Sequence, residues 1–143
     1  MEHQHLSTEV KLIDQKIKFS GRSRDNSEVI MDYFPPFGEG QGYTGLEMLL
    51  LSFSGCSGTA IAVLLRKMNK TVTGMAIRAT GTRQETLPMA FSKIEMEFLV
   101  TSPDANTPDL LKAIHMAEDS MCPVWAMIKG NVEIVTRCEV RKP

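Results

Sequence analysis

The residues of this sequence best suited to redox chemistry are its three cysteines, Cys56, Cys122 and Cys138. A cysteine thiolate is a strong nucleophile, and its oxidation to a sulfenic acid is reversible when a second thiol lies within reach. An odd number of cysteines does not suit a framework of structural disulfides alone. The local sequence around each thiol therefore indicates whether it is a candidate for such chemistry or a small buried side chain.

Cys56 lies among small residues, in the run Ser54-Gly55-Cys56-Ser57-Gly58. At helical spacing, Ser52 and Ala60 share its face, so that a neighbouring backbone or a substrate could approach the sulfur closely. Two glycines inside a helix each cost about 1 kcal/mol relative to alanine. The pattern indicates that close approach is needed at Cys56, either by a packed element or by a substrate.

Cys122 precedes Pro123 at the expected start of a short helix, where unpaired N–H groups lower the pKa of a thiol. Burial as a packing cysteine is the alternative. Cys138 is in phase with the apolar residues of the final expected strand, so we interpret it as a core residue. No cysteine pair has CxxC spacing, and the three histidines lie apart from the cysteines. We therefore expect no metal site.

The elements that must position these thiols follow an α+β order. We expect strands over 8–20 and 28–32, a helix over 45–68, strands over 71–83 and 91–100, a helix over 107–121, a short helix over 123–130 and a strand over 131–140. Thr44 with Glu47 predicts a capping box at the long helix, and Thr107 is the expected N-cap of the next. The runs of strands appear antiparallel, with helices inserted, which favours a single α+β domain over 1–143, with 1–7 as a flexible tail.

The composition is typical of a globular protein. Among 143 residues, 16 Lys and Arg balance 17 Asp and Glu, so we expect no nucleic-acid partner. Residues 48–65 carry no charge and reach the length of a membrane span, but six of them are Ser, Thr or Gly. We therefore expect a buried helix and no membrane. The first residues lack a secretory pattern, which predicts a cytoplasmic location where thiols stay reduced.

Together, these motifs resemble the OsmC/Ohr family of thiol peroxidases. The similarity rests on the run Gly45–Leu65 (GLEMLLLSFSGCSGTAIAVLL), on Leu87-Pro88 before the strand at 91–100, and on Met121-Cys122-Pro123-Val124. It extends from residue 8 to residue 140. The resemblance implies an OsmC/Ohr-like α+β fold with antiparallel sheets packed around a long central helix. It also implies an intertwined homodimer with active sites at the subunit interface.

The resemblance further implies a two-cysteine peroxidase. Cys56 would attack a small-molecule organic hydroperoxide and become a sulfenic acid, and Cys122 would resolve this acid to a disulfide. An external dithiol or lipoyl-type reductant would then regenerate both thiols, without a bound cofactor. A non-enzymatic alternative is a dimeric, stress-associated protein that holds a small apolar ligand without peroxidase turnover.

The family also places an arginine and a glutamate at the peroxidatic thiolate. Arg24, in an Arg-Asp turn, is the closer match to the arginine, and Arg22 is the alternative. Glu47 matches the glutamate, but it lies nine residues before Cys56 where the hydroperoxide reductases have ten, and it lacks their preceding proline. Nine residues at 100° each place Glu47 on the opposite face of the helix from Cys56. A catalytic role and a helix-cap role therefore both stay open for Glu47.

The departure at Glu47 places the sequence nearer to the general OsmC-like branch than to the dedicated organic hydroperoxide reductases. The preferred hydroperoxide is therefore open. Phe53, Trp125 and Met127 would line a pocket apolar enough for an alkyl or lipid hydroperoxide, although Phe53 and Trp125 equally suit a place in the core.

Overall fold

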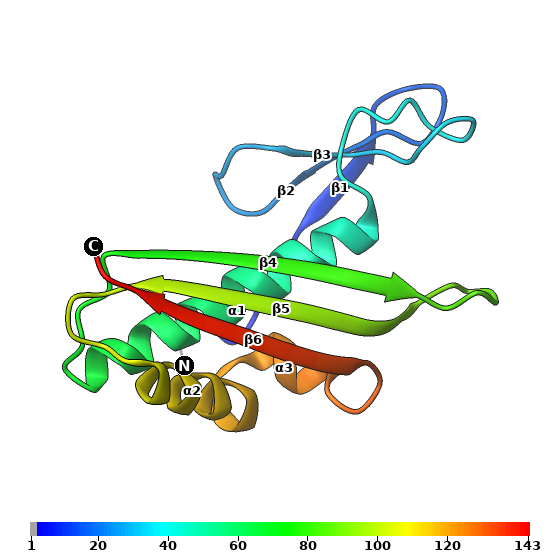
Figure 1. Cartoon of the computed structure of the whole chain (residues 1–143). Helices are drawn as coiled ribbons and strands as arrows, with labels where there is room; N and C mark the ends of the chain where they lie inside the picture. The colour runs from blue at the N-terminus through cyan, green and yellow to red at the C-terminus, as the bar shows by residue number, and fades with distance from the viewer. Residues whose placement is uncertain (1–2) are drawn as a thin grey trace. The chain divides into compact units, whose positions relative to one another are not determined.

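The computed structural model describes residues 3–143 and divides the chain into two compact units (Figure 1). The N-terminal unit is Met1–Leu49 and the C-terminal unit is Leu50–Pro143. Each unit has its own three-stranded sheet, and helices accompany the second, so the fold is α+β. Of the tail predicted at 1–7, residues 1 and 2 lie outside the described residues, and the backbone oxygen of Ser7 accepts a hydrogen bond from Ser23. The single-domain boundary stays a prediction.

The sheet of the N-terminal unit is an antiparallel meander of β1 (Glu9–Leu12), β2 (Phe19–Arg22) and β3 (Val29–Met31). The prediction of one strand over 8–20 is wrong, because the chain reverses between β1 and β2. The Asp14 carboxylate accepts the backbone N–H groups of Lys16 and Lys18 at 2.9 and 3.0 Å. A short acidic side chain that bonds the backbone in this way stabilises a turn rather than a strand.

The segment between β3 and the first helix is organised by one buried carboxylate, that of Asp32. Its two oxygens accept the backbone N–H groups of Tyr33, Glu39 and Gln41 at 2.8–3.1 Å. Burial alone would raise the pKa of Asp32, but these backbone donors outweigh it, so that the pKa lies below its ordinary value. The carboxylate therefore fixes the loop that leads into the helix.

Helix α1 (Gly45–Lys67) begins and ends with well-formed caps. The Thr44 hydroxyl accepts the Glu47 N–H at 3.2 Å, and the Glu47 carboxylate accepts the Thr44 N–H at 2.8 Å, which confirms the predicted capping box. At the other end Asn69 adopts a left-handed conformation, with φ of 62°. The N–H of Lys70 donates to Leu65 and that of Asn69 to Arg66, as in a Schellman motif. The helix ends one residue before the predicted boundary.

By length and apolar composition alone, α1 could cross a membrane. Of an apolar stretch of 18 residues in this helix, 39% is buried within the protein. The helix packs tightly on the second sheet at Gly58. A Cβ atom on this glycine would lie 2.7 Å from Cδ1 of Ile77 and 3.6 Å from the sulfur of Met75. The close approach that the small residues predicted is thus made, at Gly58, by side chains of the sheet.

The sheet of the C-terminal unit consists of three long strands side by side, β4 (Gly74–Arg83), β5 (Phe91–Thr101) and β6 (Glu133–Arg141) (Figure 1). Strand β4 is antiparallel to β5, whereas β6 is parallel to β5. The prediction of antiparallel sheets is therefore wrong for β6. The chain leaves one end of β5 and returns to the other through helices, and such a crossover produces a parallel pair.

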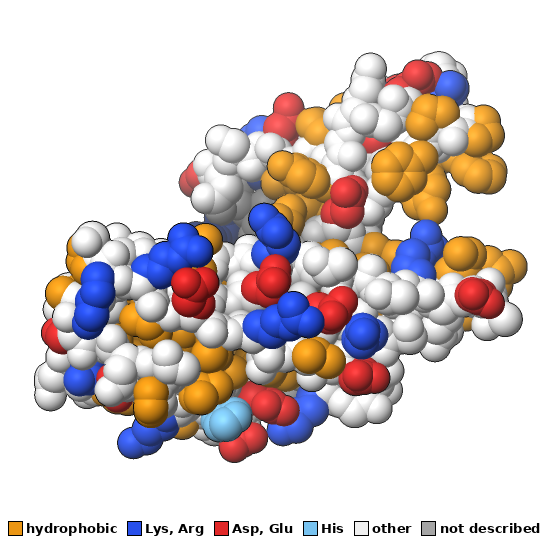
Figure 2. All heavy atoms as spheres, in the orientation of Figure 1, with side chains coloured by type: hydrophobic (Ala, Val, Ile, Leu, Met, Phe, Trp, Pro, Cys, Tyr) orange, Lys and Arg blue, Asp and Glu red, His pale blue; other side chains and the backbone are white. Residues whose placement is uncertain are grey.

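The two faces of this sheet differ in character. Alternate residues of β5 are buried and form part of the core, namely Ile94, Met96, Phe98 and Val100. On the opposite face, Arg78, Glu97 and Arg137 stand in register across the three strands. Figure 2 accordingly shows basic and acidic side chains mixed over the C-terminal unit. The buried face is the one that the helices cover.

The crossover from β5 to β6 contains α2 (Thr107–Met116), a π-helical turn η1 (Ala117–Met121) and α3 (Pro123–Ile128). The prediction of Thr107 as the N-cap of α2 is wrong. The N-cap is Asn106, because Asn106 and Asp109 form a reciprocal capping box at 2.9 and 3.0 Å. The predicted helix over 107–121 is also too long as an α-helix. Its last turn is widened, and the N–H of Cys122 donates to Ala117 at 2.9 Å.

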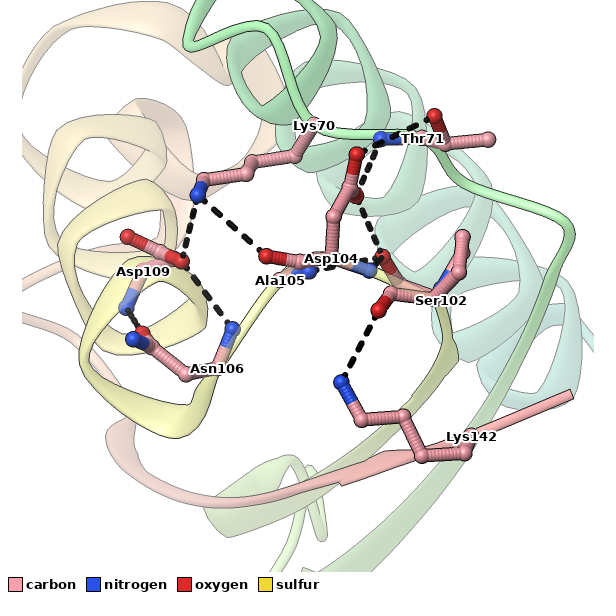
Figure 3. A network of polar contacts seen from close by, with 9 residues as sticks. Lys70, Thr71, Ser102, Asp104, Ala105, Asn106, Asp109 and Lys142 are labelled. Atoms are coloured by element: carbon pink, nitrogen blue, oxygen red, sulfur yellow. Dashed lines mark hydrogen bonds and ion pairs between the residues drawn. The ribbon is translucent and has the colours of Figure 1, made fainter.

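A polar network ties the start of this crossover to the segment after α1 (Figure 3). The Asp104 carboxylate accepts the Thr71 N–H at 2.8 Å and the Ser102 hydroxyl at 3.1 Å. Lys70 contacts both the backbone oxygen of Asp104 and the carboxylate of Asp109. The hydrogen bond from Thr71 is the main cause that lowers the pKa of Asp104. The network fixes the direction in which the crossover leaves the sheet.

Candidate functional site

Cys56 lies on α1, one turn after the buried ring of Phe53, and is half-buried. The neighbouring Gly55 has open space where a Cβ atom would stand, with no atom within 4 Å. On the other side of Cys56 in the sequence, Ser57 is fully buried. Cys56 therefore sits at the border between the packed face of α1 and its open face.

Cys122 lies between η1 and α3 and is only 2% exposed. It is the N-cap of α3, with an extended backbone (φ −94°, ψ 108°), and Pro123 follows in the first turn. Its Sγ accepts the backbone N–H of Trp125 at 3.4 Å. The widened turn η1 ends one residue earlier, at Met121.

Cys56 lies near enough to Cys122 to affect the pKa of its thiol, and both cysteines are free. Burial is the main cause that raises the pKa of the Cys122 thiol above its ordinary value of 9.0. The N–H groups of Trp125 and Val124 lower this pKa, and the hydrogen bond and charge of the Cys56 thiol raise it. Cys122 is thus a buried, protonated thiol beside a more accessible one.

Two aromatic rings pack next to this thiol pair. The rings of Phe53 and Trp125 meet edge to face, with centroids 5.2 Å apart, and both side chains are at most 1% exposed. Within the part of the chain that the structure describes, Nε1 of Trp125 is a buried donor without a hydrogen-bond partner. Met127, the third predicted lining residue, is 70% exposed. Phe53 and Trp125 thus contribute two buried rings and one unpartnered indole N–H to this part of the core.

The remaining predicted site residues, Arg24 and Glu47, lie in the N-terminal unit. Arg24 is exposed in the turn after β2, with a left-handed backbone (φ 55°). With Arg22 and residues 7–9 it lines a hollow of about 320 Å³. Glu47 is exposed, and its carboxylate accepts the Thr44 N–H in the capping box. The helix-cap role of Glu47 is confirmed, and the catalytic roles of Arg24 and Glu47 stay predictions.

Cys138 lies on β6, in register with Phe98 of β5, and is half-buried. Burial raises the pKa of its thiol above 9.0. The described residues 3–143 contain no group of three His, Cys, Asp or Glu side chains that could hold a metal ion.

The site contains two features that the sequence reasoning missed. One is the π turn, whose only sequence signal is the spacing of the buried residues: Leu110, Ile114 and Ala117 follow at helical steps, and Cys122 comes five residues later. A step of five is what a π turn produces. The other is the unpartnered indole N–H of Trp125, because the absence of an acceptor depends on packing between distant segments.

An α+β fold with two neighbouring free thiols, one on a long helix and one at the start of a crossover helix, defines a class of candidate dithiol proteins. The OsmC-like protein family model matches residues 38–137, and the chain belongs to this family. Protein YhfA of Escherichia coli K12 is 26% identical over 130 residues, which cover 87% of this chain and 90% of that protein.

Solved structures share the fold. A hypothetical protein from Aquifex aeolicus VF5 is similar with a TM-score of 0.85 and 24% identity, covering 98% of both chains. An OsmC organic hydroperoxide resistance protein from Legionella pneumophila is similar with a TM-score of 0.73 and 14% identity, covering 96% of this chain and 98% of that one. At these identities the similarity concerns the fold.

Proposed function

We propose that this protein is a cysteine-based thiol peroxidase that reduces organic hydroperoxides. The observation that carries the proposal is the proximity of Cys56 to the buried thiol of Cys122, in a chain of the OsmC-like family. Two neighbouring thiols suit a cycle in which one is oxidised and the other forms a disulfide with it. The organic hydroperoxide resistance protein from Legionella pneumophila, which shares the fold, supports the same class of substrate.

In this proposal Cys56 is the peroxidatic residue. It is the more accessible of the two thiols, since Cys56 is half-buried and Cys122 is buried. The Cys56 thiolate attacks the outer oxygen of the hydroperoxide, and the O–O bond breaks. The sulfur is oxidised by two electrons to a sulfenic acid, while the leaving alkoxide takes a proton and departs as an alcohol.

Cys122 is the resolving residue. Its buried thiol attacks the sulfur of the Cys56 sulfenic acid, so that an S–S bond forms and the S–O bond breaks. The thiol proton leaves with the hydroxyl group as water. An external dithiol, of the lipoyl type, then exchanges with the disulfide and returns both cysteines to thiols. The rings of Phe53 and Trp125 favour an alkyl or lipid hydroperoxide over a hydrophilic one.

The remaining parts of the proposal concern the surroundings of the pair. Arg24 stabilises the thiolate and the developing oxygen charge, and Glu47 orients that arginine. The protein acts as a cytoplasmic homodimer. The exposure of apolar residues along α1, with Leu51 at 52% and Val63 at 37%, supports a helix face that a second copy covers.

The proposal predicts the behaviour of the wild-type protein and of two single variants. Reduced protein should consume cumene or tert-butyl hydroperoxide in the presence of dihydrolipoate. Cys56→Ser should reduce the rate to the uncatalysed background, because the nucleophile is lost. Cys122→Ala should react with one equivalent of hydroperoxide and then stop with Cys56 as a sulfenic acid, detected by a sulfenic-acid-specific label and mass spectrometry.

Cys138→Ala is the matched control, since it removes a thiol outside the pair and should leave turnover unchanged. Mass spectrometry of the oxidised wild-type protein should identify a Cys56–Cys122 disulfide. Full turnover by Cys56→Ser would disprove the assignment. A protein that binds a small apolar ligand but neither consumes hydroperoxide nor forms the sulfenic acid would belong to the non-enzymatic alternative.

A further inference from the structure

The indole N–H of Trp125 is a buried donor that lacks an acceptor within the described residues. Leaving such a donor unpaired costs about 1–3 kcal/mol, and each instance in a folded protein calls for an explanation. The side chain is 1% exposed, so bulk water does not satisfy it. An acceptor that arrives during the reaction would explain why the donor is kept.

Two contacts place Trp125 beside the thiol pair. The backbone N–H of Trp125 donates to Sγ of Cys122 at 3.4 Å. Its ring packs edge to face on Phe53, at 5.2 Å between centroids, and Phe53 lies one helical turn before Cys56 on α1. Residues three apart on a helix are neighbours on one face. The indole ring therefore packs on a neighbour of Cys56, and the backbone of the same residue bonds the Cys122 sulfur.

We propose that the indole N–H of Trp125 is a catalytic hydrogen-bond donor to the oxygen atom that Cys56 takes from the hydroperoxide. This inference rests on the proposed function. The outer peroxide oxygen becomes bonded to Sγ of Cys56 as the O–O bond breaks, and the alkoxide leaves as an alcohol after protonation. The indole N–H donates to the transferred oxygen and keeps its own proton. When Cys122 attacks the sulfur, the oxygen leaves as water and the donor is again unpaired.

The chain offers a direct probe, because Trp125 is its only tryptophan. Protein labelled with ¹⁵N therefore gives a single indole N–H resonance. In the reduced Cys122→Ala variant this resonance should have the upfield position of a donor without an acceptor. One equivalent of tert-butyl hydroperoxide should move it downfield as the Cys56 sulfenic acid forms. In wild-type protein the disulfide product should return it to the upfield position.

Mass spectrometry on the same samples separates the two proposals. If no oxygen adduct forms on Cys56, the proposed function fails. If the adduct forms and the indole resonance stays unmoved, the role of Trp125 fails while the peroxidase proposal stands. A downfield resonance already present in the reduced protein would also overturn the role of Trp125, because the donor would have a permanent acceptor. Cys56→Ser with hydroperoxide is the control and should show no shift.

Kinetics supply a second test. Trp125→Phe keeps an aromatic ring and removes the N–H, and the loss of one hydrogen bond in the transition state should lower kcat/KM by about tenfold. The variant should fold, as judged by its circular dichroism, and should retain the Cys56–Cys122 disulfide as its product. An unchanged kcat/KM in a folded Trp125→Phe variant would contradict the proposal.

Discussion

At the scale of single residues, the thiols of Cys122 and Cys138 share one property, namely that burial raises their pKa values. A raised pKa means that the fold favours the neutral thiol. This contribution to stability is fully present below the ordinary pKa of 9.0 and is lost as the pH rises through the raised value. The protein should therefore become less stable in alkaline solution.

We expect the free energy of unfolding to fall above pH 9, by at most about 1.4 kcal/mol per pH unit for each thiol. Denaturant unfolding under reducing conditions between pH 7 and pH 10.5 would measure this slope. The comparison with Cys122→Ala isolates one thiol, since the slope of this variant should be shallower than that of the wild type. Parallel pH profiles for the two proteins would contradict the expectation.

The roles of the residues differ in how far the sequence could predict them. The Thr44–Glu47 capping box depends on residue types three positions apart, and its prediction is confirmed. The pairing of Cys56 with Cys122 came from a family resemblance, because they lie sixty-six positions apart and no local rule spans that distance. The lack of an acceptor for the indole N–H of Trp125 could not be predicted, since it depends on how side chains from distant segments pack around the ring.

At the scale of elements, the glycines of α1 have opposite environments. A Cβ atom on Gly55 would meet no atom within 4 Å, whereas one on Gly58 would lie 2.7 Å from Cδ1 of Ile77. Replacing glycine by alanine inside a helix favours the helix by about 1 kcal/mol when nothing obstructs the new methyl group. The two positions therefore form a matched pair.

We expect Gly55→Ala to raise the free energy of unfolding by about 1 kcal/mol. Gly58→Ala should gain less or lose stability, because the side chain of Ile77 must move to make room. Denaturant unfolding of the two variants at one protein concentration would compare them. A larger gain at Gly58 than at Gly55 would contradict the packing of α1 on β4.

The elements themselves were predicted best where the sequence marks a whole segment, by a capping box and an uncharged run in α1 and by alternation in β5. The errors have specific physical causes. Asp14 stabilises a turn in a segment whose composition suits a continuous strand. Asn106, and not Thr107, is the N-cap of α2. Strand β6 pairs with β5 in parallel. Strand direction depends on the path of the crossover, and no residue within β6 encodes it.

At the scale of the whole molecule, each of the two units is held by a carboxylate with a lowered pKa. Asp32 orders the loop of the N-terminal unit, and Asp104 anchors the crossover of the C-terminal unit. A lowered pKa in an acidic group stabilises the fold above the ordinary value of 3.8, and this stabilisation is lost as the pH falls through the lowered value. Acid should therefore weaken both units.

We expect Asp104→Asn to be less stable than the wild type at pH 7, because the amide cannot accept from Thr71 and Ser102 as a charged carboxylate does. The difference in melting temperature should shrink as the pH falls below 3.8. Asp25→Asn, on an exposed turn, is the control and should track the wild type. A constant difference between Asp104→Asn and wild type across this range would show that charge plays no part.

The parallel pairing of β5 and β6 has a consequence for how the molecule forms. Strands β4 and β5 are joined by a short connection, whereas about forty residues separate the paired positions of β5 and β6, as in Lys93 and Glu133. Pairs that are distant along the chain form slowly, since a long loop must close first. Cys122 lies within that loop. We therefore expect a nascent chain to carry Cys56 and Cys122 as separate thiols until β6 docks.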